Sequence, residues 1–172
     1  MKSKKWLLLS IVFFLIVVSV FLHYTIGFPL VIETSKAESS FSVEKGENVK
    51  LLSDFNFSEG DWAAYIIFNN EDNNSANRLL SLKAYKTQDT SLLNNMKKDW
   101  IFDCTGSDMA TIQSHMYLFN EGVLKYKSGI VLEKNLQGFQ SPQCGWVQSK
   151  ETDIIYNYCK EFKPIYWPIL IL

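Results

Sequence analysis

Residues 110–132 read ATIQSHMYLF, NEG and VLKYKSGIVL, two runs rich in strand formers with a short turn between them. The turn ends in a glycine, which adopts a positive φ without steric cost. The first half of the second run alternates, so that its two lysines face one side of the strand. The opposite side is predicted to hold Leu124, Tyr126 and Ser128. The pattern predicts a β-hairpin.

Other strands and loops follow from composition. Trp62–Phe68 is apolar, aromatic and β-branched, which indicates a buried strand, and Trp146–Gln148 is a possible short strand. Leu79–Lys86 fits a strand or a helix. Two segments with few apolar residues or several turn formers are expected to be loops: 69–77 and 138–145.

Two segments have the spacing of amphipathic helices. Ser91–Trp100 carries apolar residues along one helical face, with Ser91 or Asp89 as the N-cap. Thr152–Phe162 repeats the pattern, with Thr152 as its possible cap. The chain is therefore predicted to be α+β: an N-terminal single transmembrane helix followed by one small extracytoplasmic domain with an antiparallel sheet and two or three helices.

The N-terminus has the pattern of a membrane segment. Three lysines at positions 2, 4 and 5 precede Trp6–Leu22, an apolar run without charge. Such an arrangement favours insertion with the N-terminus in the cytoplasm. A removed signal peptide is the alternative to a permanent anchor. The run is long for a signal peptide, and the small-residue pattern Ser35-Lys36-Ala37 lies well beyond it, so an uncleaved anchor is favoured.

These features divide the chain into four segments. They are a cytoplasmic basic stub (1–5), a transmembrane signal-anchor in membrane lipid (6–26), a juxtamembrane stalk (27–56) and an extracytoplasmic α+β domain (57–172). The abundance of lysine and asparagine over arginine suggests an AT-rich genome. The expected location is the bacterial inner membrane, single-pass, with the N-terminus cytoplasmic and the main domain periplasmic.

The charge balance excludes one class of partner. Residues 33–172 contain 14 basic and 18 acidic residues, and the whole chain has a net charge of −1. Nucleic-acid binding requires a basic face, and none is visible in the sequence.

Three cysteines follow the membrane segment: Cys104, Cys144 and Cys159. An oxidising compartment favours pairing, and an odd count leaves one thiol. Spacing does not select the pair. Cys144 with Cys159 is the preferred disulfide, with Cys104 as the alternative partner.

The sequence holds no convincing catalytic, cofactor or metal site. The best nucleophile patch is Asp103–Asp108, which contains Cys104 and Ser107, with His115 downstream. It lacks the Gly-x-Ser-x-Gly elbow of many hydrolases. The acidic loop at 71–74 lacks the spacing of an EF-hand. We therefore expect no cofactor and no enzymatic activity.

The C-terminus, Ile165–Leu172, is wholly apolar. Three interpretations remain open for it: a final strand buried against the sheet, a contact with the membrane interface, or a tail that docks in a partner. Tyr166 and Trp167 suit a membrane contact and a partner contact equally.

A binding role remains by elimination. The expected function is a membrane-anchored extracytoplasmic protein-interaction module with one protein partner outside the cytoplasm, in a specific form an immunity-type inhibitor of a periplasm-acting toxin. The alternative is an accessory subunit of an envelope membrane complex. An envelope hydrolase is the weakest of the three hypotheses.

Overall fold

The structure is a computed structural model that describes residues 2–26, 30–34, 46–68, 83–106, 114–133, 136–141, 145–151, 153–167 and 169–172. The described helices are α1 (Lys2–Ile26), α3 (Thr90–Asp99) and α4 (Ile154–Cys159). The strands are β1 (Leu30–Ile32), β2 (Asn48–Lys50), β3 (Trp62–Ile67), β4 (Ala84–Thr87), β5 (Ile101–Cys104), β6 (Ser114–Asn120), β7 (Val123–Glu133), β8 (Leu136–Ser141), β9 (Gly145–Ser149), β10 (Lys163–Pro164) and β11 (Ile169–Ile171).

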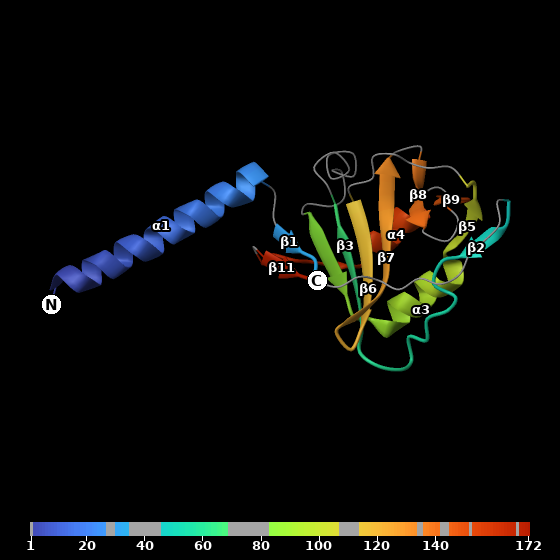
Figure 1. Ribbon diagram of the computed structural model, residues 1–172, viewed down its shortest axis with the longest axis horizontal. Coiled ribbons are helices and arrows are strands. Elements are labelled where there is room, and N and C mark those ends of the chain that lie inside the picture. The colour runs from blue at the N-terminus through green and yellow to red at the C-terminus, as the bar shows by residue number, and fades with distance from the viewer. Residues whose placement is uncertain are drawn as a thin grey trace.

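Helix α1 projects away from the rest of the molecule (Figure 1). Its window Lys4–Phe21 has a mean hydropathy of 2.2 and no buried residue. By length and composition it is suited to cross a membrane, a property that a membrane span shares with a signal sequence. The prediction of a long apolar N-terminal helix is confirmed.

Nine strands form one antiparallel sheet in the order β10-β4-β3-β6-β7-β8-β9-β5-β2. The large sheet with few helices confirms the predicted α+β class. A second sheet pairs β1 with β11 in parallel. We call this two-stranded sheet the ribbon. Figure 1 shows it between α1 and the large sheet.

The predicted hairpin is β6 and β7. Its two-residue turn has a positive φ at Glu121 (52°) and at Gly122 (76°), which is a type I′ turn. One detail differs from the prediction. A register shift pairs Phe119 with Leu124 and Leu118 with Tyr126, so Leu124 and Tyr126 pack in different clusters. A bulge of this kind breaks strict alternation between the faces. Residues 107–113 lie outside the described part of the chain.

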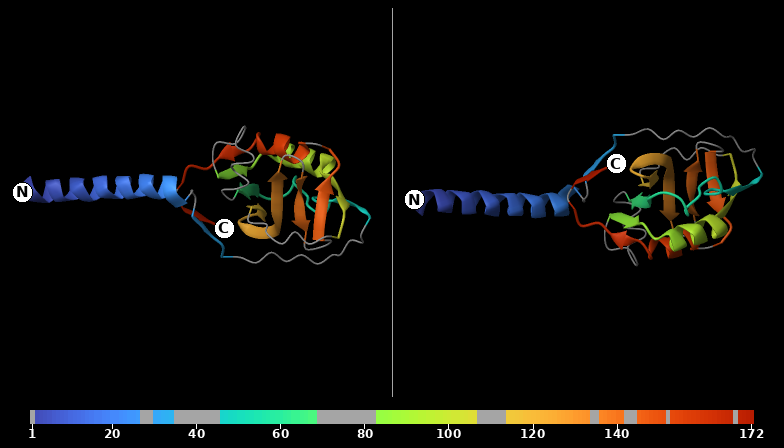
Figure 2. Two further views of the ribbon diagram at one scale, coloured as in Figure 1. Left: turned by 90° about the horizontal axis from the view of Figure 1, so that it is seen from above. Right: turned by 90° about the horizontal axis from the view of Figure 1, so that it is seen from below.

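Both predicted helices lie on one face of the sheet (Figure 2). The Asp89 carboxylate caps α3 by accepting hydrogen bonds from the backbone N–H groups of Ser91 and Leu92, which confirms one of the two predicted caps. Helix α4 is shorter than predicted, with Asp153 at its N-cap position, and the predicted cap Thr152 lies outside the described residues. Side chains from both helices, with Trp100 and sheet residues, form the main core.

The predicted stalk, 27–56, extends into residues that belong to the folded domain. Strand β2 pairs with β5, while Leu51 and Leu52 are buried in the main core. The Trp62 indole N–H donates to the Asn56 carbonyl at 2.8 Å, which fixes this segment to β3. The polar composition of the segment concealed the buried apolar residues Val49, Leu51 and Leu52.

The loop predicted at 138–145 is also different. Residues 138–141 belong to β8, and β9 begins at Gly145. Gly138 is there for close packing and not for a turn, because a Cβ would lie 2.2 Å from the Val147 carbonyl oxygen. Phe139 beside it is fully buried. The segment 79–86, which fitted either class, contains strand β4 from Ala84, while 69–82 falls in a gap of the description.

Candidate functional site

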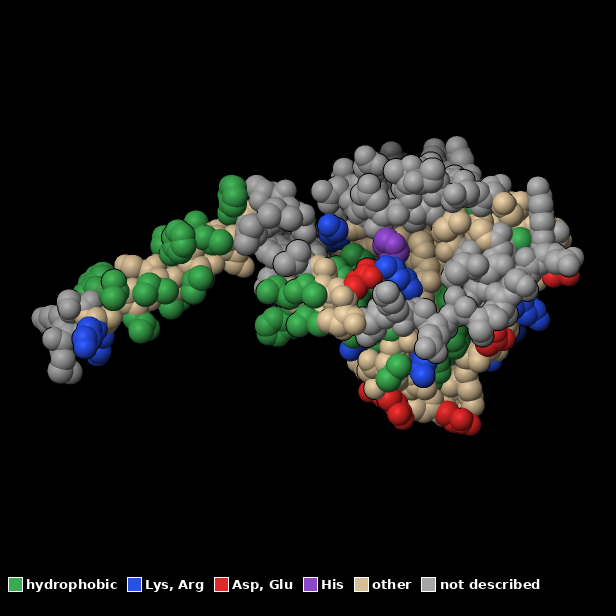
Figure 3. All heavy atoms as spheres, viewed as in Figure 1, with side chains coloured by type: hydrophobic (Ala, Val, Ile, Leu, Met, Phe, Trp, Pro, Cys, Tyr) green, Lys and Arg blue, Asp and Glu red, His purple; other side chains and the backbone are tan. Residues whose placement is uncertain are grey.

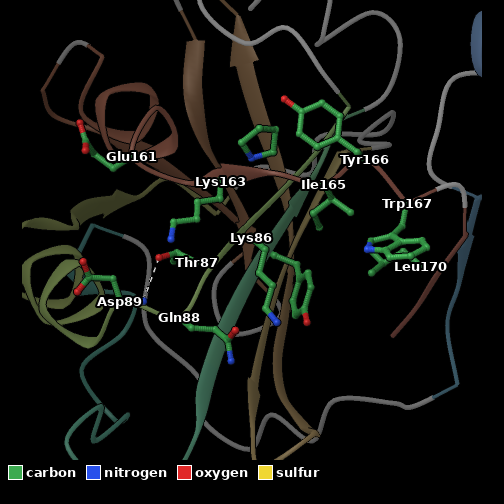
Figure 4. Close-up of a pocket in the computed structure, with 12 residues that line it drawn as sticks. Lys86, Thr87, Gln88, Asp89, Glu161, Lys163, Ile165, Tyr166, Trp167 and Leu170 are labelled. Carbon is green, nitrogen blue, oxygen red and sulfur yellow. Dashed lines mark hydrogen bonds between the residues drawn. The ribbon is translucent and has the colours of Figure 1, made fainter.

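A groove of about 720 Å³ opens at the sheet edge formed by β4 and β10. Figure 4 shows its lining side chains. It is lined by Tyr65, Lys86, Thr87, Gln88, Asp89, Glu161, Lys163, Pro164, Ile165, Tyr166, Trp167 and Leu170. The two aromatic residues predicted to contact a partner or a membrane therefore lie at one end of this groove.

The groove is built by the chain's last residues against β4. Strand β10 places Lys163 opposite Lys86. The Ile165 N–H then donates to the Ala84 carbonyl at 2.8 Å, which extends the pairing by one step. Beyond this point Tyr166 and Trp167 are 79% and 76% exposed. Neither aromatic ring is part of the core.

Four charged residues line the groove: Lys86, Lys163, Asp89 and Glu161. Lys86 and Lys163 are cross-strand neighbours, and like charges in this position destabilise a sheet. Lys86 Nζ lies 5.2 Å from the centroid of the Tyr65 ring, a cation–π contact. Among the described residues neither lysine has an ion-pair partner. Asp89 also lines the groove, but its carboxylate is engaged in capping α3.

The ribbon adjoins the aromatic end of the groove. The inward side chains of the ribbon are Val31 and Leu170. They pack against a second, smaller cluster, which includes Leu172 and lies on the sheet face opposite the helices. The Leu172 carbonyl accepts hydrogen bonds from the N–H (2.6 Å) and the hydroxyl (2.9 Å) of Thr34. The end of the tail is thus a strand, β11, as one interpretation held, but this strand pairs with β1, whereas Ile165 at the start of the tail bonds to the large sheet.

An ionic clamp holds the ribbon to the hairpin. Glu33 accepts hydrogen bonds from the Tyr117 hydroxyl and from Lys127 Nζ, both at 2.6 Å. Burial tends to raise the pKa of the Glu33 carboxyl, but the hydrogen bonds from Lys127 and Tyr117 outweigh it, and the pKa lies below its usual value of 4.5. Burial and the bond to Glu33 raise the pKa of Tyr117, which stays a donor. Figure 3 shows acidic, basic and histidine side chains together on this face.

Cys104 of the candidate nucleophile patch does not lie near His115. Cys104 is disulfide-bonded and packs in the main core. His115 lies on β6, four strand positions away, on the opposite sheet face beside the Tyr117 ring. Ser107 and Asp108 fall outside the described residues, as does the acidic loop at 71–74. Within the described ranges no group of three or more His, Cys, Asp or Glu side chains is placed to hold a metal ion.

The preferred cysteine pairing is wrong. Cys159 is a free, fully buried thiol, and burial raises its pKa. Cys104, the alternative, is the disulfide-bonded cysteine among the described residues. Cys144 belongs to a part of the chain that the structure does not describe. Helix α4 places Cys159 in the main core.

Sequence reasoning missed the clamp and the lysine pair. Glu33 is 84 positions from Tyr117 and 94 from Lys127, and Lys86 is 77 positions from Lys163. No local spacing signals such contacts. Comparison of the chain with protein-family models, with curated proteins and with solved structures found no match. The functional argument therefore depends on the geometry of the groove, the ribbon and α1.

Proposed function

We propose that the protein is a membrane-anchored interaction module that binds an acidic segment of one protein partner outside the cytoplasm. The lysine pair Lys86–Lys163 is the observation that carries this proposal. The two lysines occupy registered positions in an open groove, and carboxylates supplied by a partner would reduce the repulsion between them. A binding role is favoured over catalysis because the thiol of the nucleophile patch is disulfide-bonded.

The anchor and the compartment are parts of the same proposal. Helix α1 has the length and hydropathy of a membrane span, and the lysines before it favour a cytoplasmic N-terminus. The Cys104 disulfide supports an oxidising compartment for the domain. The specific form that we propose is an immunity-type inhibitor that neutralises a toxin in the periplasm of a bacterium.

Photocrosslinking from the groove in intact cells tests the binding role. The full chain carries a photoreactive residue at Gln88, which lines the groove, or at Lys125, an exposed residue on β7. We expect one protein to crosslink from position 88 and not from 125. The yield should fall with Lys163→Glu and stay unchanged with the charge-matched control Lys125→Glu. Equal crosslinking from both positions would contradict the proposal.

An accessory subunit of an envelope complex is the second candidate, because no residue of the α1 window Lys4–Phe21 is buried and most of its surface is exposed to possible contact with other membrane helices. Replacing residues 6–22 with an unrelated membrane anchor separates the two. An autonomous module keeps its crosslink from position 88, whereas a subunit that assembles through α1 loses it.

A further inference from the structure

The ribbon is apolar on both of its faces. Its inward side chains are covered by the domain, as described above. The outward ones are 44%, 54% and 67% exposed: Ile32, Ile169 and Ile171. A surface strand that faces water normally alternates apolar and polar residues. These outward residues therefore suit an apolar or interfacial environment, and the identity of that environment follows from where the ribbon lies.

The ribbon is tied closely to the end of α1. Segment 6–26 is about 30 Å long as a helix, which matches the hydrocarbon core of a bilayer. Strand β1 begins four residues after Ile26, so the chain places Leu30 within about 14 Å of the helix end. The headgroup layer beyond the core is itself several ångströms thick. If α1 spans a bilayer, the ribbon lies at or near its headgroups.

The surroundings of the ribbon have the chemistry of a membrane interface. Trp167 and Tyr166 are exposed amphipathic rings, which prefer the headgroup zone. Glu33, the residue after β1, is paired with Lys127 and so presents little free charge. In Figure 3 hydrophobic side chains gather on the part of the domain next to α1.

We propose that the outward face of the ribbon, together with Trp167, inserts among the lipid headgroups of the bilayer that holds α1. This inference depends on the membrane anchoring in the proposed function. It goes further because it assigns the lipid surface as the binding partner of the C-terminal tail and holds the domain against the membrane. The lysine end of the groove then stays accessible to a partner from the aqueous side.

Tryptophan quenching by brominated lipids tests the contact. The full chain is reconstituted in phosphatidylcholine vesicles with or without bromine on the upper acyl chain. Trp6→Phe removes the tryptophan of α1, and three of the remaining ones are shielded in the domain: Trp62, Trp100 and Trp146. Bromine should quench up to roughly a quarter of the emission, the share of one tryptophan among the four remaining. Adding Trp167→Phe should abolish the quenching.

Matched substitutions locate the contact on the ribbon. Ile169→Glu with Ile171→Glu should reduce the quenching of Trp167, whereas Val123→Glu, at a residue 55% exposed at the start of β7, should not. Alkaline carbonate extraction reports the anchor separately. Protein that resists extraction but shows no Trp167-dependent quenching overturns this inference and leaves the anchor intact. Protein released by carbonate overturns both. A third outcome also overturns it: Trp167 is not quenched by brominated lipid, but becomes shielded from an aqueous quencher as the protein concentration rises. That result would show that a second copy of the chain covers the ribbon.

Discussion

At the scale of single residues, Glu33 joins the segment after α1 to the centre of the large sheet. The groups that face its carboxylate are Tyr117 and Lys127, with His115 nearby. We expect Glu33→Gln to lower the free energy of unfolding by about 1 kcal/mol at pH 7, because a partly exposed ion pair and one charge-assisted hydrogen bond are lost. Chemical denaturation of the full chain in detergent measures this.

The pH dependence of that difference has a definite sign. The folded-state pKa of Glu33 lies below its usual value of 4.5, so the stabilisation is complete above that value and is lost as the pH falls through the lower, folded-state pKa. Wild type and Glu33→Gln should therefore converge in stability on acidification. A difference that stays constant from pH 7 to pH 3 would show that the carboxylate charge has no part in the clamp.

At the scale of elements, the ribbon has one face packed on the domain and one exposed face. Two adjacent residues at the C-terminus, Ile171 and Leu172, belong to different faces. Leu172 is 6% exposed and packs in the smaller cluster, whereas Ile171 is 67% exposed. We expect Leu172→Ala to cost about 2–3 kcal/mol of unfolding free energy, as for other buried leucines. The control Ile171→Ala should change it by less than about 0.5 kcal/mol. Equal effects in detergent would contradict the inward packing of the ribbon.

Elements with local signals could be predicted from the sequence, and elements defined by distant partners could not. The β6–β7 hairpin has a recognisable turn, and α3 has a cap and helical periodicity. Both elements could therefore be predicted from their own residues. Strand β2 is three residues long and exists because β5 lies beside it. Strands β1 and β11 pair two segments that are far apart in the sequence. Gly138 resembles a turn residue in the sequence, and only the folded structure shows that Trp146 packs against it.

The candidate site follows the same division. Tyr166 and Trp167 could be predicted as contact residues because two adjacent aromatic residues in a short apolar tail are visible in the sequence itself. Their neighbours in the groove come from β4 and β10, which only the folded sheet brings together. The lysine pair at their registered positions was therefore invisible from spacing alone.

At the scale of the whole molecule, the two faces of the sheet are covered by different elements. One face carries α3, α4 and the main core, while the other receives the ribbon and the clamp. The groove lies where the sheet edge meets the ribbon. The contacts of the ribbon are thus on the opposite sheet face from the core that holds the disulfide-bonded Cys104. The redox state of Cys104 in cells tests the proposed compartment of the domain.

Thiol counting on the full chain tests that compartment. Of the three cysteines, Cys159 is free, so Cys104 can pair within the chain only with Cys144. After acid trapping in cells, the denatured protein should label at one thiol, and at three after reduction. The folded protein should not label, because Cys159 is fully buried and its pKa is raised by burial. Cys159→Ser should leave no thiol before reduction. Three thiols before reduction would place the domain in a reducing compartment and contradict the proposed topology.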